Sequence, residues 1–76
     1  MTRRYTIILI PEPEEGGYSV MVPALPGCVT QGETVEEAVA MAQDAIAGWI
    51  EVAKDHGEPI PEEQQPIQTV VVDVAA

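Results

Sequence analysis

The sequence predicts an α+β domain whose strands and single helix follow one another in the order βββαβ. Short β-branched stretches separated by glycines and prolines indicate strands. One long run of apolar residues at helical spacing, residues 35–56, indicates a helix. A valine-rich stretch, residues 67–74, indicates one more strand. Because 76 residues provide room for a single domain, 1–76, we expect a three-stranded antiparallel meander, one helix across it and a fourth strand returning to the sheet.

The first two strands are expected at residues 3–10 and 18–23. The first is apolar on both of its alternating faces, which is typical of a strand covered on both sides. The helix would supply one cover, and a second subunit is a candidate for the other. In 18–23 valines alternate with other residues, which favours a strand hairpinned to the first. The connection contains Gly16-Gly17, which tolerates positive φ.

The third strand is expected at residues 28–32, after a corner of prolines and glycine, and Gly32 would end it. The helix begins with a capping box in Thr34-x-x-Glu37. The Thr34 hydroxyl can accept from the Glu37 N–H, and the Glu37 carboxylate can reach back to the Thr34 N–H. The helix would be about 33 Å long. Its core stripe is Val35, Ala38, Val39, Ala42, Ala45, Ile46, Trp49, Ile50 and Ala53.

The charge is strongly unbalanced. Three Lys and Arg residues stand against thirteen Asp and Glu, a formal net charge of −10. Phosphate binding needs clustered cations, so direct nucleic acid binding is not expected. An acidic field attracts basic partners, although the same charge can serve solubility alone.

Cysteine usage and hydropathy indicate a cytoplasmic protein. Cys28 is the single cysteine, so no disulfide within the chain is possible and a reducing compartment fits. The apolar run after Arg3-Arg4 stops at Pro11, which is short for a signal peptide. No stretch approaches the length of a membrane span.

Catalytic interpretations are weak, and neither enzymatic activity nor a cofactor or metal is expected. A two-metal nuclease needs clustered carboxylates, whereas Asp73 is the only acid inside a predicted strand. His56, the single histidine, lies where it can cap the helix end. Cys28 and Trp49 are expected to pack in the core, with an interface role for Trp49 left open.

An ordered set of motifs between Tyr5 and Pro61 resembles the HicB antitoxin family. The individual pieces are common, but their order is specific and covers most of the chain. They are Gly16-Gly17-Tyr18, Val22-Pro23-Ala24-Leu25-Pro26-Gly27-Cys28, Gly32-Glu33-Thr34-Val35-Glu36-Glu37-Ala38, Trp49 and Gly57-Glu58-Pro59-Ile60-Pro61.

The resemblance implies a partial RNase H-like βββαβ domain that binds and neutralises a HicA-type toxin. Such toxins are small basic ribonucleases that cut messenger RNA with a catalytic histidine. Family members commonly carry a C-terminal DNA-binding segment. This sequence stops at Ala76, just after the last predicted strand, so operator binding is not expected.

Two functional hypotheses follow. In the first, the domain docks on a basic toxin and occludes its active site. Charge and expected exposure name the partner-binding candidates Glu12, Glu14, Glu15, Glu37, Asp44 and Glu51. In the second, it is an orphan homo-oligomeric scaffold or small-ligand regulator without a toxin. A dimer or tetramer is expected, with candidate contacts at Met41, Gly48 and Val52, where the missing side chain of Gly48 would allow close approach.

Overall fold

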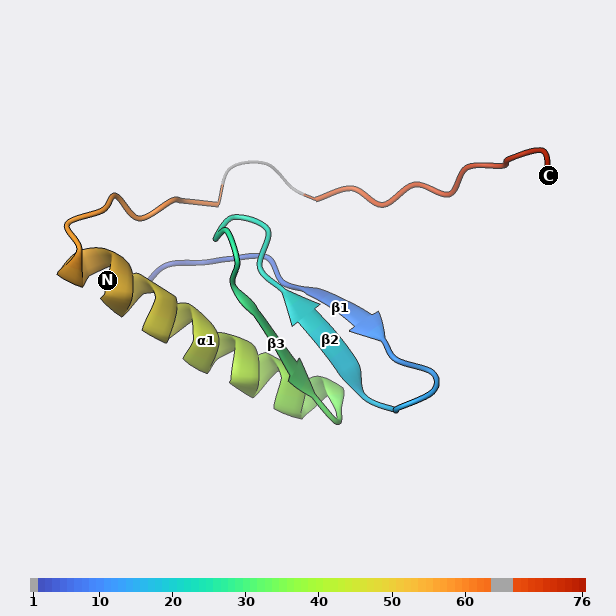
Figure 1. The fold of residues 1–76 in the computed structure, drawn as a ribbon, viewed down its shortest axis with the longest axis horizontal. Helices are drawn as coiled ribbons and strands as arrows, with labels where there is room; N and C mark the ends of the chain where they lie inside the picture. The colour runs from blue at the N-terminus through green and yellow to red at the C-terminus, as the bar shows by residue number, and fades with distance from the viewer. Residues whose placement is uncertain (1, 64–66) are drawn as a thin grey trace.

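The computed structural model describes residues 2–63 and 67–76 as a three-stranded sheet followed by one long helix. The strands pair antiparallel in the order β1-β2-β3, and the helix crosses one face of the sheet (Figure 1). The α+β class and the order of these elements are confirmed. The elements are β1 (Ile8–Pro11), β2 (Tyr18–Met21), β3 (Val29–Gly32) and α1 (Val35–Asp55).

The strands are shorter than the sequence predicts. The predicted strand 3–10 begins only at Ile8, and 18–23 ends at Met21. The pairing register explains both differences, because Ile8 lies opposite Met21. Residues before Ile8 lie opposite the corner that begins at Pro23. The chain turns there, and proline has no backbone N–H that could continue the pairing.

The predicted fourth strand over residues 67–74 does not form in the single chain. Residues 67–76 carry no regular secondary structure, and Val71 is 95% exposed. The segment extends away from the body (Figure 1), where no strand pairs with its backbone. The radius of gyration is 14.5 Å, compared with about 11 Å expected for a compact chain of this length. High β-propensity alone does not form a strand without a partner edge.

The core lies between the sheet and α1 and is small. Val20 packs with Ala38 and Ala42, while Leu25 packs with Val22 and Cys28. The helix covers mainly β3 and then β2. Two members of the predicted helical stripe are therefore wrong as core residues: Val35 and Val39 are exposed.

The face of the sheet opposite the helix is left open by the residues that the structure describes. Ile10, Met21 and Val29 are exposed there, although the sequence indicates a first strand covered on both sides. One layer of helix can bury only one face of a sheet. The expected second cover is absent among residues 2–63 and 67–76.

The helix begins as the capping pattern predicts, with one difference. The Glu37 N–H donates to the Thr34 hydroxyl at 3.1 Å. The Glu37 carboxylate accepts from the N–H of Glu33 at 3.1 Å, and not from the N–H of Thr34 as predicted. The extended backbone of Thr34, with φ −126° and ψ 169°, precedes the first helical residue. The Glu37 carboxylate thus binds the backbone of Glu33, the residue before the capping Thr34.

The helix ends at Asp55, close to the predicted end. His56 Nδ1 lies 2.9 Å from the carbonyl oxygen of Val52, which agrees with the predicted capping role. Gly57 follows with φ +66°, the left-handed conformation common after a helix. Within the described residues, no helix is both long and apolar enough to cross a bilayer.

Candidate functional site

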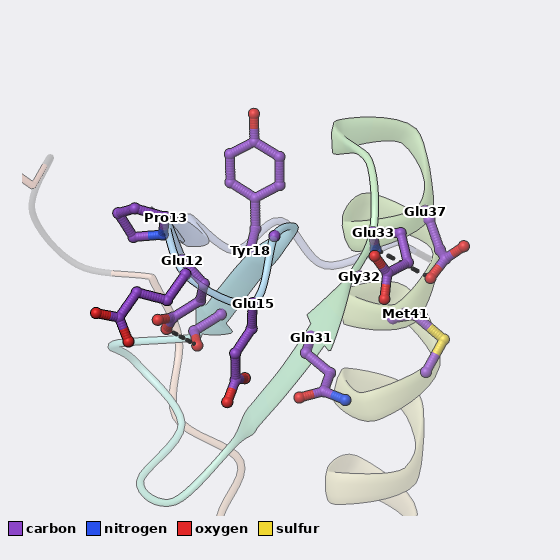
Figure 2. A pocket seen from close by; sticks show the side chains of 12 residues that line it. Glu12, Pro13, Glu15, Tyr18, Gln31, Gly32, Glu33, Glu37 and Met41 are labelled. Carbon is purple, nitrogen blue, oxygen red and sulfur yellow. Dashed lines mark hydrogen bonds between the residues drawn. The ribbon is translucent and has the colours of Figure 1, made fainter.

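An acidic concavity lies at one end of the sheet, between the β1–β2 turn and the β3–α1 corner (Figure 2). Its volume is about 740 Å³. No Lys or Arg lines it. Its carboxylates come from Glu12, Glu14, Glu15, Glu33 and Glu37. We call this set of five residues, with the surface between them, the acidic concavity.

The β1–β2 turn forms the first wall. The Glu12 N–H donates to the Gly17 carbonyl at 3.0 Å, and the Gly16 N–H donates to the Glu12 carbonyl at 2.7 Å. Gly16 and Gly17 have φ of +81° and +75°. Residues with a side chain rarely adopt such positive φ values, so the two glycines allow the turn to close. The closed turn leaves Glu14 and Glu15 exposed to solvent.

Glu12 differs from its two neighbours because a hydrogen bond orients it. The Ser19 hydroxyl donates to Glu12 Oε1 at 2.5 Å. Ser19 lies on β2 opposite Ile10, one step from the turn. This bond orients one carboxylate of the wall, whereas Glu14 and Glu15 are exposed.

The β3–α1 corner forms the second wall and depends on a close backbone approach. A Cβ added to Gly32 would lie 2.4 Å from the backbone nitrogen of Ala38, so only glycine lets β3 meet the helix here. The bond from the Glu33 N–H to Glu37 then holds the Glu37 carboxylate at the corner. Met41 lines the concavity one turn further along the helix.

Between the walls, Tyr18 and Gln31 add an aromatic ring and an amide to the carboxylates. In Figure 2 the Tyr18 ring projects to one side of the sheet end, while Glu15 and Gln31 project to the other. Carboxylates recognise Lys and Arg side chains by charge-assisted hydrogen bonds. The arrangement suits a cationic partner surface.

The structure brings together four of the six predicted partner-binding residues. Glu12, Glu14, Glu15 and Glu37 line the concavity, whereas Asp44 and Glu51 lie outside it on exposed helix positions. Sequence reasoning missed Glu33. Its position directly before the capping residue is the signal that could have found it, because acids gather at helix N-termini.

The predicted oligomer contacts Met41, Gly48 and Val52 lie along one side of α1, and their role in assembly stays a prediction. Met41 lines the acidic concavity, while Gly48 and Val52 line a separate depression of about 400 Å³ beside Trp49. Apart from the neighbouring helix backbone, no atom of the described residues lies within 4 Å of a Cβ built on Gly48. Trp49 is half-buried, and its indole N–H donates to the Pro26 carbonyl at 3.0 Å.

The other candidate reactive groups have structural surroundings. Cys28 is buried, and burial raises the pKa of its thiol, which disfavours the nucleophilic thiolate. Asp73 is exposed and lies outside any strand. In the part of the chain that the structure describes, no three His, Cys, Asp or Glu side chains lie close enough to hold a metal ion.

The chain is thus a small, acidic α+β domain with a carboxylate-lined concavity at one end of its sheet. Residues 5–74 match the family model described as a HicB-like antitoxin of a bacterial toxin–antitoxin system, so the chain belongs to this family. This confirms the resemblance drawn from the motifs. Antitoxins of this family act as inhibitory or regulatory proteins and not as enzymes, which supports a non-enzymatic role.

Individual relatives agree with the family match. A UPF0150 protein of Thermoplasma acidophilum is 50% identical over 58 residues, which is 76% of this chain and 83% of the relative. Antitoxin HicB 1 of Photorhabdus laumondii is 47% identical, and Antitoxin HicB of Escherichia coli K12 is 43% identical, each over 58 residues. The matched region spans only 37% and 41% of these two antitoxins.

Proposed function

We propose that this chain binds a small basic toxin of the HicA type and neutralises it by covering its RNA-cleaving site. The observation that carries the proposal is the acidic concavity, in which five carboxylates from two separate segments converge without a cation among its lining residues. Membership of an antitoxin family supplies the class of partner.

Electrostatics would act in two stages. The net charge of −10 steers a basic protein toward this chain and raises the association rate. The carboxylates of the concavity then pair with cations that otherwise hold RNA phosphates. A toxin docked in this way cannot bind its substrate, because the same cationic groups are occupied.

Asp44 and Glu51 have a secondary place in this proposal. They follow Glu37 at intervals of seven residues, so all three lie along one side of α1. Asp44 is two turns, about 10 Å, from Glu37. They contribute to the long-range field, whereas Glu14 and Glu15 make the direct contacts.

The remaining parts of the proposal concern location and assembly. We place the protein in the cytoplasm, where messenger RNA and its toxin would be found. We also propose a homo-oligomer, and no direct binding of nucleic acid, because three cations against thirteen acids cannot neutralise a row of phosphates.

A pair of charge-reversal variants tests the site. The variant with both Glu14→Lys and Glu15→Lys changes two exposed carboxylates in the concavity. The matched control with both Asp44→Lys and Glu51→Lys makes the same net charge change outside it. We expect the first to weaken toxin binding at least about tenfold more than the control does. Titration calorimetry with a purified HicA-type toxin measures both.

Growth rescue provides the functional readout. Co-expression of the unaltered chain should restore growth to cells that express the toxin, and the Glu14/Glu15 variant should fail to do so. Equal weakening in both variants would show that only overall charge matters, which contradicts the proposed site. Absence of any complex would favour the second hypothesis, an orphan scaffold or ligand-binding regulator.

A further inference from the structure

A second hollow, distinct from the acidic concavity, lies between the N-terminal segment and α1. It has a volume of about 750 Å³. Its floor includes Ile46 and Ile50, which are half-buried, and Val39, which is 39% exposed. All three cations of the chain, Arg3, Arg4 and Lys54, line it. We call these six residues and the surface between them the cationic groove.

The cationic groove lies beside an open sheet edge. β1 pairs with β2 on one side only, and among the described residues no strand pairs with its outer edge. The bond from the Glu12 N–H to Gly17 marks a hydrogen-bonded pair, and such pairs alternate along an antiparallel ladder. The backbone groups of Ile7 and Leu9 therefore point outward, where another strand could bind them.

The valine segment, residues 67–74, has the properties of such a strand. Val70, Val72 and Val74 share one face and are all exposed, at 76%, 73% and 80%. The backbone is extended and forms no ladder. The segment contains one acid, Asp73, although the whole chain has thirteen. In a protein of net charge −10, a nearly uncharged segment can approach another copy with little repulsion.

We infer that the valine segment of one copy adds to the outer edge of β1 in a second copy, with its valine face in the cationic groove. The strands run antiparallel, and Asp73 lies opposite Arg4. In this register Val72 falls opposite Tyr5 and Val70 opposite Ile7, both on the helix side of the sheet. A two-fold axis makes the exchange reciprocal, so two edges are closed at once.

The direction of the strand distinguishes a second copy from the chain's own segment. Glu63 accepts from the Thr6 N–H at 3.0 Å, and the Tyr5 hydroxyl donates to the Pro61 carbonyl at 2.6 Å. These contacts hold the chain near Arg4 shortly before the valine segment. Continuing along its own β1 would make the strands parallel and carry Asp73 away from the cations, by about 3.3 Å per residue. An antiparallel strand from another copy would instead place Asp73 opposite Arg4.

Mass and isotope-filtered NMR on the full chain test the exchange. Light scattering after gel filtration should give twice the monomer mass. In an equal mixture of ¹³C-labelled and unlabelled chains, filtered NOEs should join Val70 and Val72 methyl groups of one copy to Ile7 and Ile46 methyl groups of the other. A monomer, a dimer without these NOEs, or NOEs confined to one chain would each overturn the inference.

Charge exchange provides a second test that does not depend on spectra. Asp73→Arg and Arg4→Asp should each raise the dimer dissociation constant about tenfold, and the double variant should recover most of the loss. Glu36→Arg, an equal charge change on an exposed residue at the far end of α1, should leave the constant within about twofold. Absence of recovery in the double variant would contradict the pairing of Asp73 with Arg4.

Discussion

The two hollows of this domain differ in almost every physical property. The acidic concavity is lined by five carboxylates and a half-buried tyrosine, whereas the cationic groove combines an apolar floor with every Lys and Arg in the chain. The concavity is open and charged, as a site for a basic protein should be. The groove matches a segment of this same sequence. One small fold can thus separate a site for a foreign partner from a site for its own copy.

The separation follows from how the elements run. Both the β1–β2 turn and the β3–α1 corner lie at the end of the sheet where β1 and β3 finish, so their acids meet there. The end of α1 returns to the start of β1, which brings Lys54 to Arg3 and Arg4. The acids of the concavity and the three cations of the groove therefore lie at opposite ends of a short sheet.

The largest effect is expected from Gly32→Ala, which breaks the wall of the concavity. The added Cβ would overlap the Ala38 backbone, and overpacking of this kind costs about 3 kcal/mol. Gly48→Ala is the matched control, because its Cβ meets open space in a helix and should stabilise by up to about 1 kcal/mol. Urea unfolding measures both. Destabilisation by Gly48→Ala would instead support the predicted close contact at that position.

Salt should separate the two associations. Binding of a basic partner at the concavity is steered by charge, so its association rate should fall about tenfold between roughly 0.05 and 0.3 M salt. The dissociation constant of the dimer formed at the cationic groove should change far less with salt. Burial of apolar surface supplies most of the free energy of that association. Stopped-flow mixing and concentration-dependent light scattering provide the two measurements. Equal salt dependence would remove the distinction between the hollows.

Thr34→Ala should have a smaller effect on stability, through loss of the helix cap at the β3–α1 corner. Loss of the hydroxyl that accepts from the Glu37 N–H costs about 1 kcal/mol of stability. Thr34→Ser keeps the acceptor and should cost much less. Thermal unfolding followed by circular dichroism compares the two. An equal loss in both variants would mean that the threonine methyl group, and not the cap, stabilises this corner.

The smallest effect concerns Glu63, next to the groove. Hydrogen bonds from the side chain and backbone of Thr6 hold the pKa of Glu63 below its usual range. A lowered pKa in the folded state adds stability above the pKa of the unfolded chain, and this stability is lost as pH falls through the folded value. Glu63→Gln should therefore flatten the acid side of the stability profile slightly. An unchanged pH profile of stability would show that the hydrogen bond between Thr6 and Glu63 does not stabilise the fold in solution.

Local signals predicted the helix and the turn well. Apolar spacing over 35–56 and the Thr34-x-x-Glu37 pattern are contained in consecutive residues, and the helix lies within one residue of its expected end. The acids of the first wall were found for the same reason, since Glu12, Glu14 and Glu15 are neighbours in sequence.

What the sequence could not predict depends on contacts between distant residues. The valine pattern of 67–74 shows β-propensity but does not say whose edge it joins. The distance from Asp44 and Glu51 to the turn, and the meeting of Lys54 with Arg3, depend on where α1 crosses the sheet. Val39 sits at core spacing yet stays exposed, because the helix covers β3 more than β1.

Amide chemical-shift mapping tests the role of the acidic concavity most directly. The ¹⁵N-labelled chain is titrated with a purified HicA-type toxin. The account predicts the largest shifts at residues 12–17 and 33–37, with little change at residues 3–7. Largest shifts around Arg3 and Arg4, or shifts spread evenly over the acidic surface, would contradict it.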